Sequence, residues 1–244
     1  MKHCDTSSAA PKIVTGWGES RIIRTMTTHA ARTAFLTSIL IGAFTSPAFA
    51  ASGKTERIGP LTGTEVSDPL KQAVEEKGYR VTLDDGWMAE LWVAKPLKTA
   101  KQDIPGALYP ELTNGEFVGV VRFPQGMSDY RGQSLPPGVY TLRYQLLPQD
   151  GNHMGVAPNP DFLLASPAAS DSRPEQSYVY KKLVALSAKS TGSGHPAVIA
   201  LEGAGETATV VKTDHGTVVF TVAIPSGSGA AEKLGIVLKG AGTQ

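Results

Sequence analysis

Cysteine is nearly absent from this chain of 244 residues, because the one cysteine, Cys4, stands close to the N-terminus. A lone cysteine forms no disulfide within the chain and supplies no set of thiolates for a metal ion. We therefore expect the folded part of the protein to be held together by its apolar core alone.

An excess of positive charge is also lacking. Residues 51–244 carry 18 lysine and arginine side chains and 20 aspartate and glutamate side chains, a formal charge of −2. A nucleic-acid interface needs clustered positive charge. This balance therefore argues against a nucleic-acid partner.

Two common enzyme signatures are missing or incomplete. No serine stands in the Gly-x-Ser-x-Gly pattern of the hydrolase elbow. Residues 203–208 match the letters of a dinucleotide-binding loop, but Thr209-Val210-Val211 then predict a strand where the motif needs a helix N-terminus. The sequence thus favours neither a serine hydrolase nor a dinucleotide-dependent enzyme.

A hydrophobic run of about 20 residues, the length that crosses a bilayer, is missing too. The shorter apolar run from Ala34 to Phe44 follows a basic head with Arg32 and precedes Pro47 and Ala48-Phe49-Ala50. Basic head, short apolar run and small-x-small site are the three parts of a secretory signal peptide. The alternatives are an uncleaved anchor and a buried core helix.

We expect residues 26–50 to be this signal peptide, with cleavage between Ala50 and Ala51. Residues 1–25 then either precede a true start at Met26 or form a long n-region. The junction has no cysteine for a lipid anchor. The expected product is a soluble periplasmic or secreted protein with no membrane span after processing.

Glycine and proline punctuate the rest of the chain, which contains 26 and 17 of them. They separate short runs that are rich in aromatic and β-branched residues, a pattern typical of a mainly β protein. We expect a flexible lead over 51–63 and one domain over 64–244, folded as an antiparallel β-sandwich. The predicted strands are 79–83, 87–94, 117–123, 139–147, 162–165, 197–201, 207–212, 217–224 and 234–238.

The clearest strand pattern lies in 139–147, where Tyr140, Leu142, Tyr144 and Leu146 alternate with polar residues. In a strand these four side chains share one face, and Thr141, Arg143 and Gln145 share the other.

Two helices are expected beside the strands. A short N-terminal helix has Asp68 as its N-cap and Pro69 at its first position. An inserted helix runs from Pro174 to about Ala188, after a capping box formed by Ser172 and Glu175.

The element Pro-Gly-Val-Tyr-Thr-Leu at 137–142 resembles the turn and strand of transthyretin-like and other immunoglobulin-like sandwiches, which implies a related fold and no particular activity. Together with Tyr-Arg-Gly-Gln at 130–133, Asp-Gly-Asn-His-Met-Gly at 150–155 and Asp-Phe-Leu-Leu at 161–164, it also resembles a family of exported bacterial proteins of uncharacterised function.

Polar side chains gather between 130 and 161. Asp150 and His153 share one short segment, and Asp161 follows it. Carboxylate and imidazole groups in an open loop can hold a divalent ion or position a water molecule. The alternative is an Asx-type turn in which Asp150 and Asn152 bond the local backbone.

Arginine and tryptophan residues supply further candidates for ligand binding. Arg131 and Arg143 could clamp a carboxylate or phosphate, although a strand arginine more often pairs with an acid on a neighbouring strand. Trp87 and Trp92 are an odd number of residues apart, so a regular strand directs them to opposite faces. One is then a core residue, and the other can form a stacking platform for a sugar.

The sequence therefore predicts an exported, non-catalytic β protein that binds a ligand or an envelope partner and contains no cofactor. The alternative is a metal-binding protein or metal-dependent hydrolase that uses Asp150, His153 and Asp161.

Overall fold

The computed structural model describes residues 53–100, 104–148, 155–227 and 229–240. All of them belong to one structural unit, Ser46–Gln244. The cleavage site between Ala50 and Ala51 and the whole predicted signal peptide lie outside the described residues.

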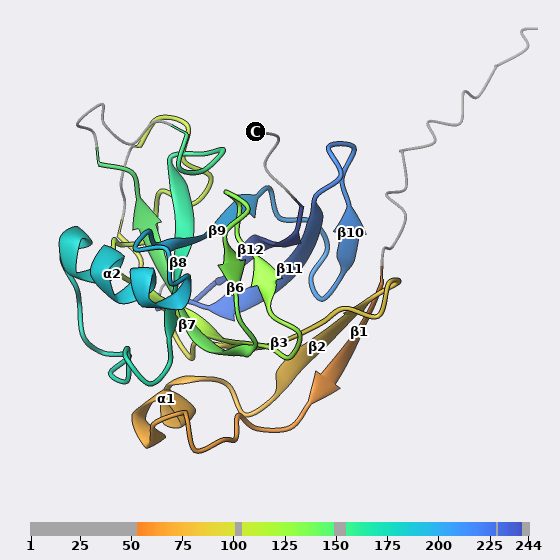
Figure 1. Ribbon diagram of the computed structural model, residues 1–244, viewed down its shortest axis with the longest axis horizontal. Helices are drawn as coiled ribbons and strands as arrows, with labels where there is room; N and C mark the ends of the chain where they lie inside the picture. The colour runs from red at the N-terminus through yellow and green to blue at the C-terminus, as the bar shows by residue number, and fades with distance from the viewer. Residues whose placement is uncertain (1–52, 101–103, 149–154, 228, 241–244) are drawn as a thin grey trace, which may run out of the picture. The chain divides into compact units, whose positions relative to one another are not determined.

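The described chain is mainly β and its strands form one large antiparallel sheet (Figure 1). In order across the sheet, its strands are β1 (Gly53–Ile58), β2 (Gly78–Leu83), β3 (Met88–Val93), β4 (Phe117–Phe123), β7 (Gly138–Leu146), β8 (Asp161–Pro167), β9 (Ala197–Glu202), β12 (Ala231–Lys239), β11 (Val218–Pro225) and β10 (Val210–Lys212). A small hairpin is separate from this sheet and consists of β5 (Met127–Ser128) and β6 (Ser134–Leu135).

Strand β9 joins the two halves of the sheet. Its first part, from Ala197 to Ala200, pairs with β8, whereas Leu201 and Glu202 pair with β12. The sheet therefore curls at β9, so that its two halves face each other and their side chains meet in one core. The rings of Tyr79 on β2 and Phe220 on β11, for example, have centroids 5.5 Å apart.

The edge strands β1 and β10 approach each other at the far ends of the sheet (Figure 1). No β-ladder joins these two strands among the described residues. The sheet is thus nearly a barrel. The expected sandwich of two separate sheets is not what this topology shows, because β9 carries the backbone hydrogen bonding continuously from one half to the other.

Each of the nine predicted strands coincides with an observed strand, although 207–212 is a strand only over Val210–Lys212, and β7 has the predicted alternation. Tyr140, Leu142, Tyr144 and Leu146 lie in the main core, and the intervening polar residues are buried on the opposite face. The sequence missed β1 and the β5–β6 hairpin. Residues 53–58 were expected within a flexible lead, but they pair along their whole length with β2.

Helix α1 (Asp68–Ala73) and helix α2 (Tyr180–Ser187) are both short, and a 3-10 turn, η1 (Ala188–Ser190), follows α2. The N-cap position of helix α1 is Ser67, one residue before the predicted N-cap, and its side chain makes no capping hydrogen bond. Helix α2 begins well after Pro174, and its N-cap is Val179 without a side-chain hydrogen bond. The predicted capping box of Ser172 and Glu175 is therefore wrong.

Tertiary contacts explain why the helix does not begin at Pro174. The carbonyl oxygens of Arg173 and Gln176 accept hydrogen bonds from the Arg143 guanidinium at 2.9 and 3.0 Å. These carbonyls lie where the first turn of a helix would form, and a buried arginine holds them in a loop. In the part of the chain that the structure describes, no helix is long and apolar enough to cross a membrane.

Candidate ligand-binding groove

Asp161, the one member of the predicted metal set that the structure describes, is fully buried at the start of β8. Its Oδ1 accepts the backbone N–H of Leu108 at 3.0 Å, and its Oδ2 accepts that of Tyr109 at 2.8 Å. The Tyr144 hydroxyl lies 3.3 Å from Oδ2. Asp161 thus fastens the segment before β4 to the sheet through both carboxylate oxygens.

The other two members, Asp150 and His153, lie outside the described residues. Among the residues that the structure does describe, no group of three or more histidine, cysteine, aspartate or glutamate side chains is arranged to hold a metal ion.

Arg143 is buried on the outer face of β7, where it faces Asp171 in the loop after β8. Its Nε and Nη2 donate to the two Asp171 oxygens at 2.6 and 2.9 Å. The remaining N–H groups donate to the carbonyls of Gly115, Arg173 and Gln176. A guanidinium has five N–H donors, so every one of them already has a partner within the protein.

Arg131 lies in the turn between β5 and β6, apart from the partners of Arg143. Its Nη2 donates to the Pro196 carbonyl at 3.1 Å, and its backbone N–H donates to the buried carboxylate of Asp129. The same carboxylate accepts N–H groups from Gln133 and Val198. Arg131, Arg143 and Asp161 thus have separate partners, and the structure does not gather them into one site.

The two tryptophans differ in the way that their odd spacing predicted. Trp92 is buried on the outer side of β3, where Arg122 lies over its ring, and its Nε1 donates to the Gly59 carbonyl at 2.9 Å. Trp87 is partly exposed and packs against Phe123 on the inner side of the sheet. Trp87 therefore stands at the mouth of the near-barrel.

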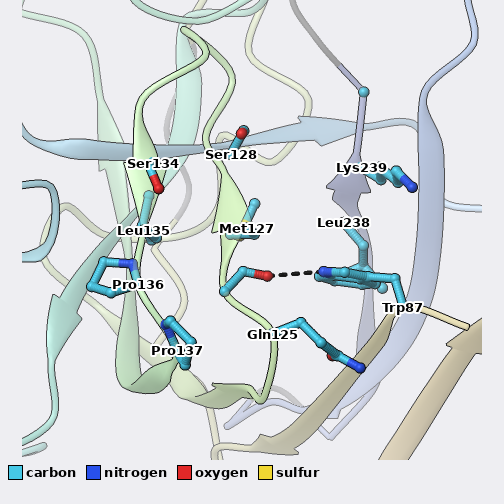
Figure 2. Close-up of a pocket in the computed structure, with 12 residues that line it drawn as sticks. Trp87, Gln125, Met127, Ser128, Ser134, Leu135, Pro136, Pro137, Leu238 and Lys239 are labelled. Atoms are coloured by element: carbon cyan, nitrogen blue, oxygen red, sulfur yellow. Dashed lines mark hydrogen bonds between the residues drawn. The ribbon is translucent and has the colours of Figure 1, made fainter.

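A groove of about 520 Å³ opens beside Trp87, between the β5–β6 hairpin and the end of β12 (Figure 2). Its floor contains the buried Leu135 and Leu238, and the exposed Ser128 and Ser134 lie on the hairpin. The complete lining is Trp87, Gln125, Gly126, Met127, Ser128, Ser134, Leu135, Pro136, Pro137, Leu238, Lys239 and Gly240.

Hydrogen bonds fix the orientation of Trp87. Its Nε1 donates to the Gly126 carbonyl at 2.9 Å across the groove, as Figure 2 shows. Its backbone N–H donates to Asp85 Oδ1 at 3.0 Å, within the Asp84-Asp85-Gly86 turn between β2 and β3. Trp87 is thus held at its backbone and at its indole, and the indole N–H donor is already used.

Gly126 is the residue that lets the hairpin approach Trp87. It has a φ of +73°, and a Cβ at this position would lie 2.5 Å from the Leu135 carbonyl oxygen. Because only glycine tolerates both the left-handed backbone and this contact, the chain can turn back under the indole.

An aromatic row supports the same wall of the groove. The ring centroids of Trp87 and Phe123 are 5.9 Å apart, and so are those of Phe123 and Tyr140. The Tyr140 hydroxyl donates to the Pro136 carbonyl at 2.5 Å. Burial raises the pKa of this hydroxyl, which therefore stays protonated as a donor. These ring contacts and the Tyr140 hydrogen bond connect Trp87 with the hairpin through the core.

Lys239 is the charged side chain of the groove. It is half-exposed and forms an ion pair with Asp85 of the β2–β3 turn. The hydrogen bond from Lys239 is the main cause that lowers the pKa of Asp85, and the hydrogen bond from the Trp87 backbone N–H lowers this pKa further. Sequence reasoning named Trp87 and Trp92 as stacking candidates but missed Lys239, because the two members of the ion pair are 154 residues apart.

Comparisons with protein-family models, with curated proteins and with solved structures found no significant match for the chain.

Proposed function

We propose that this protein is an exported, non-catalytic binding protein whose ligand occupies the groove beside Trp87. The observation that supports it best is the fixed, partly exposed indole at the mouth of the near-barrel. Ligand sites commonly occupy the mouths of β-barrels and combine apolar surface with a few polar groups. The groove has this composition.

The export part of the proposal rests on the sequence alone. The three-part signal predicted over 26–50 supports a location in the periplasm or outside the cell. The groove would then bind a ligand found there or a partner in the cell envelope.

The described lining supports binding more than catalysis. It contains an aromatic side chain, two serine hydroxyls, an amide and Lys239, which is paired with Asp85 beside the groove. Nucleophilic catalysis by serine needs a base within hydrogen-bond reach of the hydroxyl. Within the described lining, Ser128 and Ser134 face each other across the hairpin, and neither is hydrogen-bonded to a histidine or carboxylate.

A thermal-shift screen tests the proposal. The purified protein is heated with neutral oligosaccharides, acidic oligosaccharides and proline-rich peptides, and hits are titrated by tryptophan fluorescence. A ligand that binds only the native state at 100 times its Kd stabilises it by about 2.7 kcal/mol. We expect a hit of this kind.

Two variants assign a hit to the groove. Trp87→Ala should abolish the binding and the fluorescence change. Val179→Ala, which alters an exposed apolar residue outside the groove, should leave both unchanged. The proposal is wrong if no probe stabilises the protein, or if binding persists in Trp87→Ala.

A further inference from the structure

The groove beside Trp87 continues past Lys239. A second hollow of about 350 Å³ shares Lys239 and Gly240 with it. The rest of its lining comes from the β2–β3 turn, the end of β10 and the start of β11: Leu83, Asp84, Asp85, Lys212, Gly216 and Val218. The ion pair of Asp85 and Lys239 stands where the two hollows meet, so a long ligand could touch both.

The charges along the two hollows balance. Lys239 and Lys212 supply two positive groups, and Asp84 and Asp85 supply two negative groups. A polyanion would meet both aspartates, and a polycation would meet both lysines, with like-charge repulsion in each case. This balance favours a ligand that has no net charge and many hydrogen-bonding groups.

Trp87 adds a constraint on the shape of that ligand. Its N–H already donates to Gly126, so the partly exposed indole offers a ligand apolar surface and no hydrogen-bond donor. A ligand carbonyl, such as that of a proline-rich peptide, would find no donor on this ring. The apolar face of a sugar ring needs none, and the two serines, the Gln125 amide and the ion pair can bond its hydroxyls.

We propose that the ligand is a neutral oligosaccharide that lies along both hollows, with one ring stacked on Trp87 and a later ring beside Asp85, Lys239 and Lys212. This inference rests on the proposed function, because it names the ligand class for the same groove and extends the site beyond it.

The test is a titration with sugars of increasing length. The probes are glucose, cello-oligosaccharides, malto-oligosaccharides and chito-oligosaccharides of increasing length, with oligogalacturonates as acidic probes of matched length. We expect Kd for one neutral series to fall roughly tenfold or more once the chain is long enough to reach the second hollow. That affinity should change little with ionic strength, because the ligand carries no charge.

Two substitutions report on the second hollow. Asp85→Asn keeps the oxygen that accepts the Trp87 N–H but removes the charge partner of Lys239. Lys212→Ala removes the lysine at the far side. Each should weaken the binding of the long sugar severalfold, with the melting temperature measured to confirm folding. Lys212→Ala, which changes the second hollow alone, should leave the shortest binding sugar unaffected.

The outcomes separate the two proposals. If sugar affinity does not depend on length and both variants bind normally, the site does not extend into the second hollow and the inference fails. If a proline-rich peptide or an acidic sugar binds in a Trp87-dependent manner and neutral sugars do not, the inference fails while the proposed function stands. If none of the probes binds, both fail.

Discussion

Arg143 and Asp171 form a doubly hydrogen-bonded ion pair in which both side chains are almost completely excluded from solvent, at 1% and 0% exposure. The pair joins β7 to the loop after β8. Because the guanidinium also holds three carbonyls of neighbouring segments, it organises the chain around it and is not available to a ligand.

Removing one partner of this pair should be strongly destabilising. Asp171→Ala leaves a buried guanidinium without its counter-charge, which lowers the free energy of unfolding by about 3–5 kcal/mol. Urea denaturation measures the loss. Glu56→Ala is the matched control, because its pair with Lys54 is exposed and should contribute less than about 1 kcal/mol. Equal effects of the two substitutions would contradict a structural role for Asp171.

Asp161 should behave as a structural carboxylate. Asp161→Asn places an amide N–H2 opposite one of the two backbone N–H groups, and an unsatisfied buried donor costs about 1–3 kcal/mol. We expect the melting temperature to fall by the same amount with and without chelator. A chelator that lowers the melting temperature of the wild-type protein but not of the variant would instead support the metal hypothesis.

The pH dependence of stability should contain a contribution from Glu232. Burial raises the pKa of this carboxyl above its ordinary value of 4.5, and the neighbouring Glu111 raises it further. The folded state then binds the proton more tightly than the unfolded state does. Stability therefore falls as the pH rises from the unfolded pKa through the folded pKa, and this contribution is constant above it.

Glu232→Gln removes the proton-binding group and should make the protein more stable than the wild type at neutral pH. The difference should shrink as the pH falls below the unfolded pKa, where the wild-type carboxyl is protonated in both states. Urea denaturation at about pH 4 and pH 7 measures it. Glu175→Gln, which alters an exposed acid, is the control. Equal stability of Glu232→Gln and wild type at neutral pH would contradict the expectation.

A matched pair of glycines isolates the close approach beneath Trp87. Gly126 and Gly86 both have a left-handed backbone, at φ of +73° and +82°, but an added Cβ meets an atom within 4 Å only at Gly126. Gly86→Ala should cost about 1–2 kcal/mol for the backbone conformation. Gly126→Ala should cost clearly more and should also weaken ligand binding at the groove. Similar losses in urea denaturation would show that the Leu135 carbonyl moves aside.

Local patterns in the sequence determined much of the fold. The strict alternation from Tyr140 to Leu146 predicted both the strand and its core face, because the side-chain period of a strand depends only on the strand itself. The turn at Asp84-Asp85-Gly86 is likewise a local feature, since an Asp-Gly pair favours a tight turn and Gly86 has the positive φ that it requires.

Long-range contacts decided what the sequence could not. Residues 53–58 have no apolar pattern of their own, and they become a strand by pairing with β2. The segment after Ser172 has a helix-start signal, but hydrogen bonds from Arg143 hold it as a loop. Likewise, the sequence named Trp87 and Trp92 as stacking candidates without choosing between them, whereas the meeting of Asp85 with Lys239 depends on how the sheet curls. The spacing of residues along the chain indicates which side chains are neighbours within one strand or helix. Only the tertiary structure brings residues that are distant in the sequence into one groove.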